Sequence, residues 1–245
     1  MSAAATVIVP QHGRSDLTLA CVRSFREAHG DGAPIIMIDD GSDSGEIEKL
    51  AAAAPPNVQL MRLERCGVTA AWNAGANATT SEFLVFLNND VATTGPWLVE
   101  LIAPLRSEGT VICGVERRME QALPEAILRR LPTREFAAGW CFAVRRDDFD
   151  AVGGFEPSLR LYFSDTDLQA RLLARVGRGR EAIAVFGSRS LTHIGHATAS
   201  RLRGRRDQWR ADRARFVALW RRSRTEFSQQ AVLVPKLCWG SKLTG

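Results

Sequence analysis

The sequence is poor in lysine and has no long apolar run. Lys49, Lys236 and Lys242 are the only lysines among 245 residues, so the net charge of +5 rests almost wholly on arginine. No stretch approaches the roughly 18 consecutive apolar residues that a membrane-spanning helix needs. The N-terminus enters an apolar strand directly, without the basic region and cleavage site of a secretory signal. We therefore expect a cytoplasmic protein.

Paired cysteines are also lacking. The five cysteines are scattered, odd in number and form no C-x-x-C pair. This pattern disfavours a disulfide framework and a zinc site, and it fits a reducing compartment.

Acidic residues are scarce near the end of the chain. Residues 201–224 carry ten arginines, against Asp207 and Asp212 as the only acids. Apolar residues recur here near heptad spacing, which predicts a basic amphipathic helix: Leu202, Trp209, Phe216, Val217 and Trp220. Such a helix can pack its aromatic side chains on the core with its arginines solvated, or it can lie on an anionic membrane at the inner face. Residues 225–245 follow as a tail, either a docked arm or a frayed end.

Strand and helix patterns alternate through the first half. Short apolar strands are predicted at residues 6–10, 35–38, 58–63 and 83–87. Helices are predicted between and after them, at residues 15–28, 46–54, 69–78 and 96–106. This alternation predicts an α/β fold with a mainly parallel sheet and helices on both faces.

The second half is less regular. Strands are predicted at residues 111–115, 140–144 and 182–186, and helices at 147–152 and 165–176. Residues 119–131 are predicted to form a helix or a lid-like connection that ends at Pro132.

The strand at residues 83–87 ends in Asn88, Asn89 and Asp90. Open α/β sheets bind ligands at the carboxyl ends of their strands. Asp90 could hold a hard divalent cation there and, through it, a diphosphate. The alternative is an ordinary turn after a strand.

Two more acidic clusters and one histidine cluster are candidates for chemistry. Asp39 could accept hydrogen bonds from a nucleotide's base or ribose, or it could make an Asx-turn or cap the next helix. Asp165 could take a proton from an attacking hydroxyl, whereas Ser164 to Asp167 could form only a capping box. His193 and His196 are either metal ligands or structural residues.

Taken in order, five motifs resemble those of the family 2 glycosyltransferases, which are inverting enzymes of the GT-A fold. The resemblance covers about residues 5–200. It rests on Val7 to Pro10 with Arg14, Ile38 to Ser42, Gly67 to Gly75, Leu87 to Asp90, and Gly153 to Glu156 followed by Asp165 to Leu168 with Arg171. His193-Ile194-Gly195 is similar to a late element of that family that can supply a metal ligand.

The resemblance implies roles for single residues. Asp165 would be the catalytic base, and Asp90 with His193 would bind Mn²⁺ or Mg²⁺. The implied donor residues are Pro10, Arg14, Asp39, Gly67, Asn73, Asn88 and Asn89. The expected acceptor residues are Trp140, Phe155, Glu156 and Asp167, with Trp72 another candidate for sugar stacking.

Some positions depart from the family pattern. Asn88 replaces the first carboxylate of the metal motif, as in the rhamnosyl- and galactofuranosyltransferase-like branches. Ser164 stands where a glutamate is usual, and Arg65 where an asparagine is common.

We therefore expect one GT-A domain at residues 1–200, with a nucleotide-binding half at 1–106 and an acceptor half at 107–200. Its expected activity is metal-dependent, inverting transfer of a hexosyl or deoxyhexosyl group from a UDP-, dTDP- or GDP-linked sugar. The expected acceptor is a hydroxyl of a saccharide or glycolipid, in synthesis of bacterial cell-surface polysaccharide. The alternatives are a nucleotidyltransferase acting on sugar phosphates and a non-catalytic module that binds nucleotides or nucleic acid, with nucleic acid the partner least expected.

Overall fold

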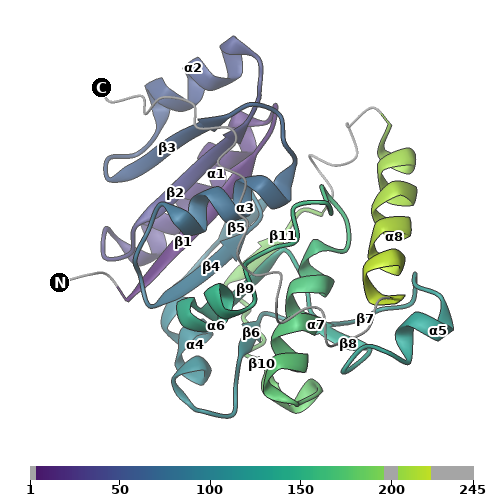
Figure 1. Ribbon diagram of the computed structural model, residues 1–245. Helices are drawn as coiled ribbons and strands as arrows, with labels where there is room; N and C mark the ends of the chain where they lie inside the picture. Colours follow the sequence, from purple (N-terminus) through teal and green to yellow (C-terminus); the bar gives the residue numbers. More distant parts are fainter. Residues whose placement is uncertain (1–3, 196–203, 222–245) are drawn as a thin grey trace.

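A seven-stranded mixed sheet forms the centre of the structure, a computed structural model that describes residues 4–195 and 204–221 (Figure 1). Its strand order is β10-β6-β9-β4-β1-β2-β3. The strands are β1 (Ala5–Gln11), β2 (Ile35–Asp40), β3 (Val58–Leu63), β4 (Phe83–Leu87), β6 (Ile112–Gly114), β9 (Cys141–Arg145) and β10 (Ile183–Val185). The helices are α1 (Ser15–His29), α2 (Ser44–Ala53), α3 (Val68–Asn77), α4 (Leu98–Ile102), α5 (Glu125–Leu128), α6 (Arg146–Ala151), α7 (Ser164–Val176) and α8 (Arg205–Arg221).

The sheet is parallel except at β9. Strand β1 pairs in parallel with β2 and β4, and β2 pairs in parallel with β3. Strand β9 runs antiparallel between β4 and β6. The carboxyl ends of β1, β2 and β4 therefore meet at one edge, as the alternation of strands and helices predicted.

Side-chain alternation along the strands divides the core in two. In β1, Ile8 packs on the face covered by α3, α6 and α7, while Val7 and Val9 pack on the face covered by α1, α2 and α4. Burial on both faces explains why the strands read as continuous apolar runs. The result is a sheet sandwiched between two helical layers (Figure 1).

Two short antiparallel ribbons lie outside the main sheet. One joins β5 (Val91–Thr93) to β11 (Leu191–His193), and the other joins β7 (Arg117–Met119) to β8 (Glu135–Ala137). The ribbons are absent from the sequence prediction because their short strands lack the apolar run that marks the equally short β6 and β10.

The helix predicted through residues 119–131 is wrong over most of its length. Its first residue, Met119, ends β7, and α5 covers only Glu125–Leu128. Pro124 allows a helix to begin after it but cannot continue one from before, since its nitrogen carries no hydrogen. The helix predicted from residue 96 begins at Leu98, and it tightens into the 3₁₀ helix η1 (Ala103–Arg106) around Pro104.

Helix α8 packs its apolar side chains on the core, as the packed alternative predicted. Phe216, Val217 and Trp220 are buried among residues of α7 and its surroundings. The predicted ends of this helix, with Leu202, and the tail at 225–245 lie outside the described residues. No helix within the described residues is both long and apolar enough to cross a bilayer.

Candidate active site

A cavity of about 1100 Å³ opens at the carboxyl ends of β1, β2 and β4. Its walls come from many parts of the chain, among them the ends of β1 and β2, the start of α3, the turn after β4 and the β7 region. Residues 138–142, residue 193, the loop into α7 with the start of that helix, and the first turns of α8 complete them. Asp90 and Asp165 both line it, although 75 residues separate them in sequence. Of the three acids expected to have a role, Asp90 and Asp165 thus share one cavity, and Asp39 does not line it.

Asp90 is placed by the turn after β4 and by the β5–β11 ribbon. The ribbon pairs His193 with Val91, and the Ile194 N–H donates to the Asp90 carbonyl oxygen at 3.0 Å. This register brings the His193 side chain to Asp90, with Nε2 3.1 Å from Oδ1. Asp90 and His193, which lie far apart in the chain, therefore place an oxygen and a nitrogen atom side by side.

The pair has the chemistry of a divalent-metal site. His193 Nε2 is buried and has no hydrogen-bond partner among the described residues, although the Asp90 carboxylate lies beside it. A carboxylate oxygen and an imidazole nitrogen side by side suit Mn²⁺, which takes oxygen and nitrogen ligands. Within the described chain, no three His, Cys, Asp or Glu side chains are grouped to hold a cation by themselves. A cation here would leave coordination positions for a ligand's phosphate oxygens.

Trp140 fixes the ring of His193. The two rings stack at 5.0 Å between centroids with 14° between planes, and the Trp140 Nε1–H donates to Glu116 at 2.9 Å. The Trp140 carbonyl oxygen accepts from the Asn88 N–H at 2.8 Å. Trp140, which was predicted to contact an acceptor sugar, thus lies in the cavity wall, and it also supports the Asp90–His193 pair.

Asp165 lies at the first turn of α7, facing the cavity. Phe163, two residues earlier, has φ of 64°, an uncommon conformation for a residue other than glycine. One side of the carboxylate is closed by Gly139, where a Cβ atom would fall 2.2 Å from Asp165 Oδ2. The Arg118 guanidinium lies 3.2 Å from the same oxygen and is half exposed. Asp165 is itself partly exposed, so a molecule in the cavity can reach its carboxylate.

Asp39 does not line the cavity. It is fully buried and accepts hydrogen bonds from Gln11 Nε2 and from the Ser42 hydroxyl and N–H. Its bond to the Ser42 N–H, three residues on, fixes the local turn, so the structural role expected for this residue is present in a form close to an Asx-turn. Asp40 lines the cavity instead, and its carboxylate holds the Cys66 N–H at 2.6 Å and the Gly67 N–H at 2.9 Å.

The other predicted donor residues divide into two groups. Pro10, Gly67, Asn88 and Asn89 line the cavity. Arg14 and Asn73 do not: Arg14 pairs with Asp16 at 2.7 Å, and Asn73 exchanges two hydrogen bonds of 2.9 Å with the backbone of Phe155. The Asn73 contact holds the Gly153–Gly154 turn, which is a structural task.

Three of the predicted acceptor residues also lie outside the cavity wall. Phe155 is buried against Trp72 and Phe86. Asp167 is buried and bonded to Arg171 at 2.8 Å and to Trp220 Nε1 at 3.0 Å. Glu156 accepts from the Ser158 N–H at 3.0 Å. Sequence reasoning missed Gly139 and Arg118, because nothing in their local sequence marks them as neighbours of the cavity. In the acidic pair at the end of β2 it assigned the role to Asp39 and not to Asp40.

The fold and this site define a class of protein: a GT-A glycosyltransferase, with the mixed sheet and the cleft at its strand ends. The chain resembles the mannosyltransferase PcManGT from Pyrobaculum calidifontis in complex with GDP-Man and Mn²⁺, with a TM-score of 0.59 and 16% identity over 89% of this chain and 62% of that one. It also resembles GalNAc-T7 with UDP, GalNAc and Mn²⁺, with a TM-score of 0.54 and 18% identity over 70% of this chain and 41% of that one.

Residues 6–167 match the sequence model of the family named glycosyl transferase family 2. The match covers more than half of the sequence, so the chain belongs to glycosyl transferase family 2. It is also 27% identical over 231 residues to the O-antigen biosynthesis protein RfbC of Myxococcus xanthus, covering 80% of this chain and 17% of RfbC. The chain thus spans only a small part of that relative. Family membership favours glycosyl transfer over both alternatives, the nucleotidyltransferase and the non-catalytic module.

Proposed function

We propose that this chain is a metal-dependent, inverting glycosyltransferase that moves a hexosyl or deoxyhexosyl group from a nucleotide-diphosphate sugar to a hydroxyl of a saccharide or lipid-linked acceptor. The observation that carries the proposal is the single cavity lined by both the Asp90–His193 pair and Asp165. One group of side chains suits a leaving diphosphate, and the other suits an entering hydroxyl.

Asp90 and His193 would hold Mn²⁺ or Mg²⁺ on the donor side of the cavity. The cation, when bound, offsets the negative charge that grows on the diphosphate as it leaves. Asn88 and Asn89 extend the same wall, and the 66–67 backbone held by Asp40 borders the space for the nucleoside. The buried Asp39 serves this wall by fixing the turn that presents Asp40.

Asp165 would take the proton from the acceptor hydroxyl as its oxygen attacks the anomeric carbon. The bond from the anomeric carbon to the acceptor oxygen forms while the bond to the diphosphate oxygen breaks, and the nucleoside diphosphate departs. Attack from the face opposite the leaving group inverts the anomeric configuration. Arg118 beside Asp165 places a positive charge near the anion until the acceptor arrives.

The ligands bound in the similar structures support this choice of donor, since they include GDP-Man and UDP with Mn²⁺. The similarity to RfbC supports a role in cell-surface polysaccharide synthesis. A lipid-linked acceptor would place the protein at the inner face of a membrane. The exposed arginines of α8, Arg206, Arg210 and Arg215, suit an anionic surface there.

Replacing the proposed base tests the reaction. We expect Asp165→Asn to lower kcat by about 10³-fold or more, the upper part of the range for general-base catalysis. The donor's Kd should stay within about twofold of wild type, because the amide keeps the shape of the side chain and the metal pair is untouched. Transfer is measured by release of nucleoside diphosphate from a panel of donors, and donor binding by calorimetry.

Asp147→Asn is the matched control, since Asp147 is an exposed acid on α6 that does not line the cavity. It should keep the wild-type rate. An Asp165→Asn protein that retains most of its kcat would show that another group takes the proton.

A further inference from the structure

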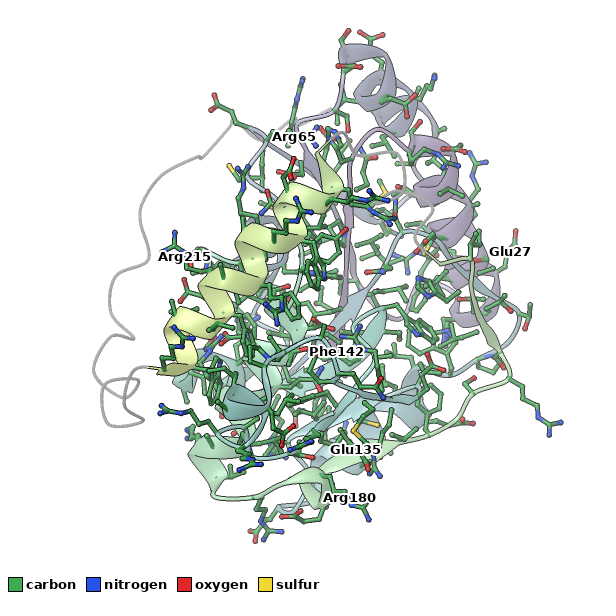
Figure 2. The ribbon with its side chains drawn as sticks, turned by 90° about the vertical axis from the view of Figure 1, so that its right-hand side faces the viewer. Glu27, Arg65, Glu135, Phe142, Arg180 and Arg215 are labelled. Carbon is green, nitrogen blue, oxygen red and sulfur yellow. The ribbon has the colours of Figure 1, made fainter. Side chains whose placement is uncertain are left out.

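The first turns of α8 form part of the cavity wall. Gly204, Arg205, Asp207, Gln208, Trp209 and Ala211 all line it. Figure 2 shows α8 crossing one side of the molecule, with Arg65 beside its N-terminal end and Arg215 directed outward from it. Arg65 lines the same cavity. The N-terminal end of α8 therefore lies beside the part of the wall that precedes α3.

A buried carboxylate of α8 holds the loop that leads into α7. Asp212 accepts hydrogen bonds from three successive backbone N–H groups, those of Arg160 at 3.2 Å, Leu161 at 3.0 Å and Tyr162 at 2.9 Å. The Gln208 amide adds a fourth donor at 2.8 Å. A carboxylate that is only 1% exposed is stable because these donors replace water. Asp212 therefore fixes the path of this loop to α8.

Residues 160–163 connect Asp212 to the first turn of α7, and so they also fix the position of Asp165. Phe163, the last of them, takes its left-handed conformation between Trp209 and Phe216 of α8, at 5.9 Å and 5.8 Å between ring centroids. Its carbonyl oxygen accepts from the Asp167 N–H at 2.9 Å, which closes the first turn of α7 around Asp165. A non-glycine residue keeps such a conformation only where its surroundings impose it. Here those surroundings belong to α8.

The same loop also contacts the donor wall. The Arg160 guanidinium donates to the carbonyl oxygens of Cys66 and Arg65, each at 3.3 Å. The Arg160 carbonyl oxygen lies so close to Gly67 that a Cβ atom there would fall 2.6 Å from it. Loop 160–163 is thus packed between α8 and the backbone that Asp40 holds.

Trp209 presents an indole ring to the cavity. The ring is 36% exposed, although Phe163 packs against it and the Arg213 guanidinium lies 5.7 Å from its centre. Apolar faces of sugar rings pack on such partly exposed aromatic surfaces. Of the three sequence candidates for stacking, Trp72 and Phe155 are 4% and 1% exposed and belong to the core, and Trp140 stacks on His193. Trp209 is the better-exposed platform.

We propose that α8 is a working part of the acceptor site, in which Trp209 is the contact surface for an acceptor sugar ring and Asp212 is a positioning residue for Asp165. This inference rests on the proposed function and deepens it. Asp212 acts through loop 160–163, and it does not touch the acceptor.

The positioning role of Asp212 is tested first by amide hydrogen exchange, a measurement that needs no acceptor. In Asp212→Asn the amide group can accept fewer of these bonds, so exchange at the amides of residues 160–162 should accelerate by about tenfold or more. Amides of β1 and β4 should be unchanged. In transfer assays kcat should fall by about tenfold while the donor's KM stays within about twofold. Arg215→Ala, an exposed change on the same helix, is the matched control and should behave as wild type.

The role of Trp209 in acceptor binding is tested with octyl glycosides of common hexoses and deoxyhexoses as acceptors. Trp209→Ala should raise the acceptor's KM by about tenfold and leave the donor's KM unchanged, and Trp209→Phe should recover most of the loss. A general loss of folded protein would lower kcat without this difference between the two KM values. Unchanged loop exchange in Asp212→Asn, or an unchanged acceptor KM in Trp209→Ala, would overturn the inference. Failure of the proposed function would look different, because wild type itself would transfer no sugar.

Discussion

At the scale of single residues, the position of Asp165 depends on a neighbour that has no side chain. Gly139 lies in the turn between β8 and β9, and its backbone packs directly against the carboxylate. No positive φ restricts this residue, so alanine is compatible with its backbone. Gly139 is required here for space and not for conformation.

We therefore predict that Gly139→Ala displaces the Asp165 carboxylate and lowers kcat by about 10²-fold, since a shift of about 1 Å in a catalytic group has costs of that order. The donor's Kd should be near the wild-type value. Transfer kinetics and calorimetry measure the two effects.

Gly45→Ala is the control for a glycine-to-alanine change. Its added methyl group meets open space on α2, and alanine in a helix should stabilise the fold slightly. Equal rates in Gly139→Ala and wild type would show that Asp165 adjusts freely or is not the base.

The same scale shows why some residues could be predicted and others could not. Asp90 and Asp165 follow from motif and strand-end position, and both line the cavity. Asp39 and Asp40 are adjacent in sequence, and only the pleat of β2 decides which one turns toward the cavity. Phe155 and Trp140 are both aromatic residues of the acceptor half, yet one is in the core and one on the wall. Side-chain direction at the end of a strand depends on packing that local sequence does not contain.

At the scale of elements, the main sheet could be predicted and the ribbons could not. Long apolar strands separated by periodic helices gave the order and type of nearly every element from β1 to β4. The β5–β11 ribbon consists of three paired residues on each side, without the apolar run that marks β6 and β10. This ribbon nevertheless brings His193 to Asp90. The position of the two proposed metal ligands therefore depends on an element that the sequence did not predict.

A second contact between elements gives a pH-dependent prediction. Glu46 of α2 pairs with Lys49 at 2.9 Å and accepts a hydrogen bond from the Ser15 N–H at the start of α1 at 2.8 Å. The Lys49 ammonium, followed by the Ser15 N–H, lowers the pKa of Glu46 from 4.5 to about 2. A carboxylate with a lowered folded-state pKa stabilises the fold above its unfolded pKa, and this contribution is lost as the pH falls from about 4.5 through about 2.

Glu46→Gln should therefore lower the free energy of unfolding near neutral pH by about 1 kcal/mol or less, because the pair is partly solvated. The difference from wild type should shrink below pH 4.5 and vanish near pH 2. Urea unfolding at a series of pH values measures it. Glu48→Gln, on the exposed side of the same helix, should show no such pH dependence, whereas a difference that stays constant with pH would contradict the assigned cause.

At the scale of the whole molecule, the cavity joins both halves of the chain, so ligand binding should stabilise the protein as a unit. A nucleoside diphosphate at about 100 times its Kd adds about 2.7 kcal/mol to the free energy of unfolding. For a chain of this size we predict a rise in Tm of about 5–10 °C with UDP or GDP in the presence of Mn²⁺. Chelation of the metal should remove most of this rise.

Asp90→Ala should lose the metal-dependent part of the rise, and Asp147→Ala, its exposed counterpart on α6, should keep it. Differential scanning fluorimetry with and without Mn²⁺ makes the comparison. An Asp90→Ala protein stabilised as strongly as wild type by metal and nucleotide would remove Asp90 from the ligand set.

The β5–β11 ribbon also sets an order of events during synthesis. Domains emerge from the ribosome N-terminal part first, and local βαβ pairings can form before distant ones. Strands β1 to β4 can assemble early, but His193 reaches Asp90 only after about a hundred further residues have been made, and α8 follows later still. A nascent chain therefore acquires strands β1 to β4 long before it can pair His193 with Asp90 or add the part of the cavity wall that α8 supplies.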